Sequence, residues 1–116
     1  MAVLVHIADR AEWELAKEQG EYRADSLEER GFIHFSHPEQ VIRVADHLYR
    51  GRVDLVLLCV DPTLLTAEIR EEDGGGGELF PHLYGPLNID AVTSVEPFRP
   101  ADDGTLRLPT RNLPAR

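Results

Sequence analysis

Short apolar segments in which successive side chains alternate between two faces recur along the chain and predict β-strands. Residues 3–7, 32–36 and 91–98 show this period of two, which is typical of strands with one buried face. Residues 54–61 are instead apolar at both parities, so we expect a central strand that is covered on both faces. A short turn followed by another strand is expected over residues 64–70.

Capping signals and glycine stops predict the helices between these strands. Asp9 and Glu12 form a capping-box-like pattern, which indicates a helix that begins there and runs to about Gln19. Gly20 follows as a natural helix stop. One further helical turn is expected over residues 25–30.

The most regular helical pattern follows the second predicted strand. Ser36 and Glu39 form another capping-box pattern, with Pro38 in the first turn, where its missing N–H is harmless. Apolar residues then recur with the spacing i, i+3, i+4 and i+7 on one helical face, and the helix is expected to end at Gly51. The residues on this face are Val41, Val44, Ala45 and Leu48.

Helices interleaved with several strands predict an α+β domain. We expect a small single domain over residues 1–98, with a mixed or mainly antiparallel sheet and two main helices. Gly74–Gly77, four consecutive glycines beside acidic residues, predict a mobile loop because glycine loses the most backbone entropy on ordering. Residues 99–116 contain little apolar sequence and predict a loosely attached tail.

Charge and composition restrict the partners and the compartment. The chain has 116 residues, with 12 Lys and Arg against 21 Asp and Glu, and a formal net charge of −9. This acidity argues against nucleic acid as a partner, because the summed field repels polyanions. No signal peptide and no membrane span are predicted. The one cysteine, Cys59, lies in an apolar run, so we expect a buried thiol and a cytoplasmic protein.

A polar face that carries histidines is shared by the predicted strands. Within residues 32–36 and 79–84, the period of two places aromatic, histidine and hydroxyl side chains together, opposite an apolar face. If these strands are neighbours, the side chains line one cleft where an imidazole donates to a ligand or transfers a proton. The residues of this predicted cleft are His6, Phe32, His34, Ser36, Phe80, His82 and Tyr84.

Other interpretations of these residues remain open. For any single histidine, a half-buried strand residue that is hydrogen-bonded to backbone is the favoured interpretation; the recurrence in three segments supports the cleft. His34, His37 and His82 form an alternative metal site. The acidic run 71–73 supplies either a carboxylate for ligand or transition-state charge, or a solvated surface. Ser36 lacks the glycine-flanked elbow of a serine nucleophile, and helix capping accounts for it.

Two sequence blocks around these histidines resemble a known family. They read GFIHFS at residues 31–36 and FPHLYGPL at residues 80–87. With the Ala-Glu-Trp helix start at residues 11–13 and the strand at 54–60, they are similar in content and order to the bacterial family catalogued as domain of unknown function 952. The resemblance covers about residues 3–98. This chain has Glu-Glu where the family often has Trp-Glu, and Val-His where it often has Tyr-Lys.

The resemblance implies more than a fold class. The family is grouped by fold with the ADP-ribosyltransferase-like superfamily, which implies a split sheet and NAD bound in a cleft between two small sheets. It also implies that His34 holds the ribose, that His82 or Tyr84 lines the nicotinamide pocket, and that Glu72 is the acidic residue.

From this resemblance we expect an ADP-ribosyltransferase-like transferase that binds NAD, a related nucleotide or an ADP-ribose ester. The alternative is a non-catalytic module of the same fold that binds a small metabolite or a protein. The partner is expected to be a small molecule or nucleotide, with no metal and no membrane involved. The expected catalytic residues are His34, Glu72 and His82; the expected cofactor-binding residues are His34, Ser36, Phe80, His82 and Tyr84.

Overall fold

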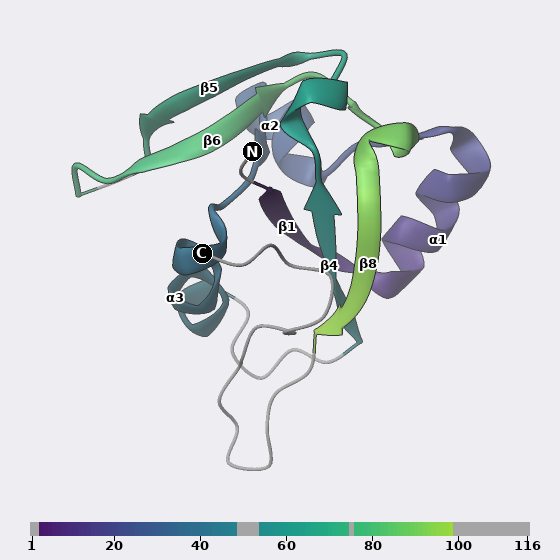
Figure 1. The fold of residues 1–116 in the computed structure, drawn as a ribbon, viewed down its shortest axis with the longest axis horizontal. Coiled ribbons are helices and arrows are strands. Elements are labelled where there is room, and N and C mark those ends of the chain that lie inside the picture. The colour runs from purple at the N-terminus through teal and green to yellow at the C-terminus, as the bar shows by residue number, and fades with distance from the viewer. Residues whose placement is uncertain (1–2, 49–53, 75, 99–116) are drawn as a thin grey trace.

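The computed structural model describes residues 3–48, 54–74 and 76–98, and these form an α+β domain (Figure 1). The predicted tail 99–116 and the helix end at Gly51 lie outside the described residues. The elements, in chain order, are β1 (Leu4–Asp9), α1 (Arg10–Gln19), β2 (Glu21–Tyr22), α2 (Asp25–Arg30), β3 (Ile33–His34), α3 (Pro38–Leu48), β4 (Leu55–Val60), the 3-10 helix η1 (Pro62–Leu64), β5 (Glu68–Asp73), β6 (Leu79–Tyr84), β7 (Leu87–Asn88), the 3-10 helix η2 (Ile89–Ala91) and β8 (Val92–Phe98).

The described strands form two three-stranded sheets and one short pair. The central sheet has the order β1-β4-β8, the second sheet has the order β3-β6-β5, and β2 pairs with β7. A single bridge between Val5 and Ser36 joins the edge of the central sheet to the chain that leaves β3. Every pairing among the described strands is antiparallel. Of the two expected arrangements, mixed or mainly antiparallel, the described strands therefore form the antiparallel one.

The core lies on both faces of the central sheet. On one face, β1, β4 and β8 pack against α3 through residues such as Val5, Leu57 and Phe98. On the other face, the sheet packs against α1 and against the inner face of the second sheet. All six residues of β4 are buried, which confirms the prediction of a central strand covered on both sides. Trp13 and Cys59 are buried in these two layers.

The helices end at the predicted glycines, but their N-terminal caps differ from the predicted ones. Gly20 and Gly31 end α1 and α2 with φ of 88° and 87°, the left-handed conformation that glycine adopts without strain. At the start of α1, the Asp9 side chain makes no capping hydrogen bond. The predicted Ser36–Glu39 capping box is wrong by one residue: the His37 N–H donates to Gln40 Oε1 at 2.9 Å, because Ser36 is still occupied in the bridge between the sheets.

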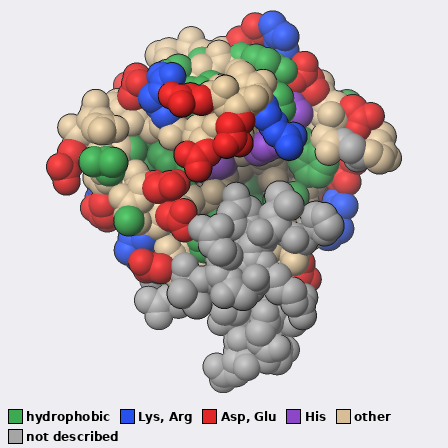
Figure 2. Space-filling view, turned by 180° about the vertical axis from the view of Figure 1, so that it is seen from behind, with side chains coloured by type: hydrophobic (Ala, Val, Ile, Leu, Met, Phe, Trp, Pro, Cys, Tyr) green, Lys and Arg blue, Asp and Glu red, His purple; other side chains and the backbone are tan. Residues whose placement is uncertain are grey.

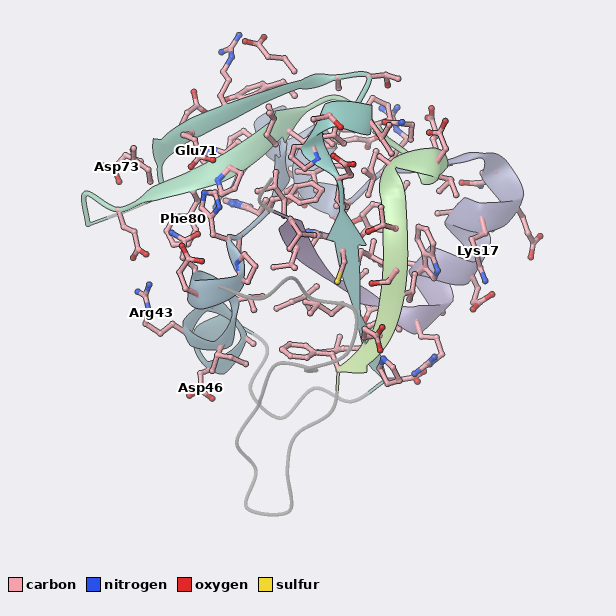
Figure 3. The ribbon with its side chains drawn as sticks, viewed as in Figure 1. Lys17, Arg43, Asp46, Glu71, Asp73 and Phe80 are labelled. Carbon is pink, nitrogen blue, oxygen red and sulfur yellow. The ribbon has the colours of Figure 1, made fainter. Side chains whose placement is uncertain are left out.

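The hairpin of β5 and β6 extends beyond the core and reaches over the N-terminal half of α3 (Figure 1). Arg43 on α3 donates two hydrogen bonds to Glu78, at 2.9 and 2.6 Å, and Gln40 donates to the same carboxylate. These bonds lower the pKa of Glu78 to about 2. They hold the hairpin end next to α3, where Arg43 and Phe80 are labelled in Figure 3.

At Gly74, in the described part of the glycine loop, a side chain would have to displace the Phe80 ring. A Cβ at this position would lie 2.5 Å from Cδ1 of Phe80, a distance that side chains do not tolerate. The Gly74 N–H also bonds to the Glu78 carbonyl at 3.0 Å and closes the hairpin. None of the helices in the described residues combines the length and the apolar composition that a bilayer crossing requires.

Candidate functional site

The outer face of the second sheet carries the chemistry-bearing side chains. His34 on β3 and Arg70 on β5 both lie opposite His82 on β6. Because directly paired residues of neighbouring strands point to the same side, these three side chains share the outer face. Ile33 and Leu83, the next pair in register, point to the opposite side and are fully buried in the core.

His82 is the central residue of this face. Its side chain is only 4% exposed, and Nδ1 lies 3.0 Å from Glu72 Oε1. Tyr84 donates its hydroxyl hydrogen to the same carboxylate oxygen. A carboxylate only accepts hydrogen bonds, so Nδ1 carries the proton of the neutral ring and Nε2 carries the lone pair. This contact fixes the orientation of the His82 ring, with Nδ1 towards Glu72.

The Nε2 atom of His82 is buried and has no hydrogen-bond partner among the residues that the structure describes. Buried polar atoms in proteins are nearly always paired, and each exception calls for an explanation such as a missing ligand or water. Glu72 accepts the bonds from His82 and Tyr84 on one oxygen, Oε1. The Nε2 atom of His82 marks the outer face as the candidate site.

Aromatic rings surround His82. Phe32 stacks on it with ring centroids 4.0 Å apart and an interplanar angle of 15°. His34 meets it edge to face at 5.1 Å, and Tyr84 lies 5.4 Å from Phe32. Phe80 lies opposite Glu72 in the strand register and covers Gly74 at the hairpin end. These rings form a partly exposed aromatic surface around a polar centre, an arrangement common in ligand sites.

The local electrostatics keep Glu72 ionised. Hydrogen bonds from Tyr84 and His82 lower the pKa of Glu72, and the negative carboxylate in turn raises the pKa of Tyr84. Desolvation by the surrounding side chains lowers the pKa of His34; repulsion from the His82 ring when that ring is protonated, and from Arg30, acts in the same direction. Near neutral pH, the site therefore presents one carboxylate together with a neutral His34.

Arg70 belongs to this face and was not singled out from the sequence. Its guanidinium carbon lies 4.5 Å from the centre of the Tyr84 ring, and the side chain pairs with Glu68 two residues earlier. The signal that would have found it is the period of two, because Arg70 and Glu72 are two residues apart on one strand.

Glu71 and His37 form a separate pair on the other side of β5. His37 Nε2 lies 3.0 Å from both oxygens of Glu71, so His37 does not join His34 and His82. Among the described residues, no group of three or more His, Cys, Asp or Glu side chains is placed to hold a metal ion. The alternative metal site of His34, His37 and His82 is therefore not assembled.

Two residues of the predicted cleft are buried and make contacts within the fold. His6 is 7% exposed; its Nδ1–H donates to the His34 carbonyl at 2.5 Å, and Nε2 lies 3.0 Å from the Tyr22 hydroxyl. Its assignment to the cleft is wrong because both ring nitrogens are used inside the fold. Ser36 is 5% exposed at the bridge to Val5. Its role in ligand binding remains a prediction.

Histidine side chains reach the surface on the side of the molecule opposite to the view of Figure 1. Figure 2 shows them between acidic and basic side chains rather than within a patch of one sign. The mixture agrees with the ion pair of Arg70 and Glu68 beside the ionised Glu72. A ligand on this face therefore meets both signs of charge next to aromatic rings.

Comparison with known proteins places the chain in a defined group. The family described as "Protein of unknown function (DUF952)" matches residues 7–95. The crystal structure of protein CC0527 from Caulobacter crescentus is 37% identical, with a TM-score of 0.83, and the match covers 91% of this chain and 94% of that one. The solution NMR structure of CC0527 is 38% identical, with a TM-score of 0.82 and coverage of 93% and 94%. Comparison with the curated proteins gave no match.

Proposed function

This chain belongs to the DUF952 family, and from that premise we propose that the outer face of β3, β6 and β5 binds NAD or a related nucleotide or ADP-ribose ester. In this proposal the domain is ADP-ribosyltransferase-like. The observation that carries the proposal is the buried, unpartnered Nε2 of His82, held by Glu72 within a group of aromatic rings.

The ligand needs a hydrogen-bond donor for this atom. In the neutral tautomer that Glu72 selects, Nε2 of His82 accepts a hydrogen bond. A ribose hydroxyl is such a donor, and it also accepts. His34 is exposed at the edge of the sheet, with its ring 5.1 Å from that of His82. The two imidazoles are spaced so that one sugar contacts both.

The aromatic rings fit the flat part of such a ligand. Phe32 and Tyr84 are both partly exposed, with ring centroids 5.4 Å apart. Nicotinamide or adenine gains by stacking on rings of this kind, in offset or edge-to-face arrangements. Phe80, partly exposed at the hairpin end, extends the same surface. We propose His34, His82 and Tyr84 as the principal ligand contacts, with Phe32 and Phe80 at the sides.

Glu72 is the residue that we propose for the chemical step. When the bond between the ribose C1 and nicotinamide breaks, nicotinamide leaves with the bonding electrons and positive charge develops on the sugar. A fixed carboxylate stabilises such charge electrostatically. The pKa of Glu72 is lowered by its bonds from Tyr84 and His82, which supports an ionised group at this place. Oε2 is the oxygen that we propose to face the sugar.

One observation favours a non-catalytic alternative. Glu72 Oε1 already accepts from two side chains, and the position before it is Glu71, whose side chain pairs with His37 on the other face. A module that only binds a small metabolite or a protein retains the same rings without needing a reactive carboxylate. We propose a cytoplasmic location for either version, because a single buried thiol suits a reducing compartment.

Calorimetry with NAD and with ADP-ribose tests the binding proposal. We expect His82→Gln to weaken binding by about 1–3 kcal/mol, the cost of leaving a buried polar partner unpaired, and His34→Ala by about 0.5–1.5 kcal/mol, the net contribution of an ordinary hydrogen bond. His37→Ala is the matched control, since His37 pairs with a glutamate on the other side of β5. Circular dichroism verifies that each variant folds. No binding of either ligand to the wild-type protein at millimolar concentration refutes the proposal.

Turnover separates the enzyme from the binding module. Release of nicotinamide from NAD is measured for the wild type, for Glu72→Gln and for Glu71→Gln. The two glutamates are consecutive and point to opposite faces, so Glu71→Gln controls for the loss of one charge. A transferase loses its rate in Glu72→Gln alone. If the wild type binds NAD and releases no nicotinamide with any acceptor, the non-catalytic alternative is correct.

A further inference from the structure

We infer that the ligand of this site carries a phosphate or pyrophosphate group, and that Arg70 binds this group by exchanging Glu68 for it. The inference deepens the proposed function, on which it rests for the nucleotide part of the ligand. Arg70 is the anion-binding residue in this assignment, while His34 and His82 contact the sugar.

Arg70 is placed beside the other ligand-contacting groups. It lies directly opposite His82 in the register of β5 and β6. Its guanidinium group lies over the Tyr84 ring, 4.5 Å from the centroid. Stacking on an aromatic face orients the planar group and leaves its N–H edge available for hydrogen bonds. A ligand bound beside His82 therefore has Arg70 as a neighbour across the strand pair.

The present partner of Arg70 is easily exchanged. Arg70 Nε and one terminal nitrogen each lie 3.0 Å from an oxygen of Glu68. The side chains of Arg70 and Glu68 are 49% and 62% exposed, and exposed ion pairs contribute little to stability. A phosphate presents two oxygens to the same guanidinium fork, so it replaces the carboxylate without changing the geometry.

Another arginine pair in the same protein shows the contrast. Arg43 also binds a glutamate through two bonds, yet that glutamate, Glu78, accepts from Gln40 as well and joins α3 to the hairpin. Glu68 and Arg70 are instead two residues apart on an edge strand, and their pairing joins no separate elements. The first pair has a structural role, whereas the second keeps an arginine in place on an exposed face.

The charges around the site indicate which carboxylate an anion at Arg70 displaces. Arg30 lies in the last turn of α2. Its positive charge contributes to the lowered pKa of His34. Of the two carboxylates on the outer face of β5, Glu72 is held by hydrogen bonds from Tyr84 and His82. Glu68 is therefore the carboxylate that an anion displaces from Arg70. Its departure frees a cation next to the aromatic surface.

The experiment measures anion binding at Arg70 separately from nucleotide binding. Inorganic pyrophosphate and ADP-ribose are titrated into the full-length protein, with the arginine Nε–H signals followed by NMR and the affinities by calorimetry. Arg70→Gln and Glu68→Gln are compared with Lys17→Gln and Glu14→Gln. Lys17 and Glu14 form an exposed ion pair on α1, and Lys17 lies on the opposite side of the molecule from Phe80 (Figure 3).

The expected results have opposite signs for the two members of the pair. Pyrophosphate and ADP-ribose shift the Arg70 Nε–H signal. Arg70→Gln weakens ADP-ribose binding by about 10-fold or more, as expected for a lost charged hydrogen bond. Glu68→Gln strengthens it by about 2–5-fold, because the competing carboxylate is gone. The α1 control variants leave both affinities unchanged apart from the small effect of net charge.

The outcomes separate this inference from the proposed function. If ADP-ribose binds and Arg70→Gln retains the full affinity, Arg70 is not the anion site, although the nucleotide proposal stands. If pyrophosphate shifts the Arg70 signal and no nucleotide binds, the anion site stands and the nucleotide proposal fails. An Arg70 signal that responds to neither ligand overturns the inference. Thermal unfolding of Arg70→Gln verifies that its loss of affinity is not a loss of fold.

Discussion

The buried ring of His6 makes the stability of this protein depend on pH above the range where carboxylates titrate. His6 lies inside the fold between the His34 carbonyl and the Tyr22 hydroxyl. Burial lowers its pKa from 6.5 to about 4. The unfolded chain therefore binds a proton at pH values where the folded chain does not, and acid favours unfolding.

The size of the effect follows from the two pKa values. His6 contributes its full stabilisation above pH 6.5, and this is lost as the pH falls towards about 4. The linkage relation gives a loss of about 1.3 kcal/mol between about pH 7.5 and pH 5.5, and about 2.5 kcal/mol by about pH 4.5. The pKa values of Glu72 and Glu78 are also lowered in the fold, and their stabilisation is lost only below about pH 4.5. The window above pH 5.5 therefore isolates the histidines.

Urea unfolding at a series of pH values measures this slope directly. The free energy of unfolding of the wild type is compared with that of His6→Gln, which retains a donor and an acceptor and cannot be protonated. The pKa of His34 is lowered in the same direction, and the difference between the two proteins removes its contribution. NMR titration of the His6 ring in the folded wild type gives the pKa independently.

The expected result is that the wild type loses about 1.3 kcal/mol more than His6→Gln between about pH 7.5 and pH 5.5. Equal slopes for the two proteins would refute the reasoning. A His6 ring that titrates near 6.5 in the folded state would also refute it. Such a pKa would mean that burial does not disfavour the charged imidazolium.

Two further predictions concern packing and reactivity. Gly74→Ala should lower the free energy of unfolding by about 1–3 kcal/mol, because its Cβ would lie 2.5 Å from the Phe80 ring; urea unfolding of Gly74→Ala and Gly74→Ala/Phe80→Leu tests this, and an equal loss in both variants contradicts the contact. Cys59 is fully buried, and burial raises the pKa of its thiol, so an aromatic disulfide reagent should label it only as fast as the protein unfolds. Labelling of the native protein at the rate of the urea-unfolded chain would contradict that burial.

Periodicity predicted the parts of the fold that a single segment determines. The run Leu55–Val60 is apolar at both parities, and it forms the central strand because that pattern suits no other place. Gly20 and Gly31 end helices because their left-handed conformation is a local property. The outward position of His34 and His82 likewise followed from the period of two.

The rest depended on contacts between distant segments. Ser36 resembles an N-cap, but its backbone pairs with Val5, 31 positions earlier in the chain, which shifts the cap to His37. His6 follows the same alternation as the site histidines, and its burial is decided by Tyr22 and His34 above it. A pattern along one strand gives the face of a side chain and does not tell what covers that face.

Glu71 and Glu72 have a consequence for the fidelity of folding. They are consecutive on β5, and each pairs with a histidine on a different side of the strand. Glycine-rich hairpins specify strand register weakly, and four glycines stand between β5 and β6. A slip by one residue turns Glu72 away from His82 and turns Ile69, which packs against the core, towards solvent. The two carboxylates thus favour the correct strand pairing over its nearest misfolded alternative.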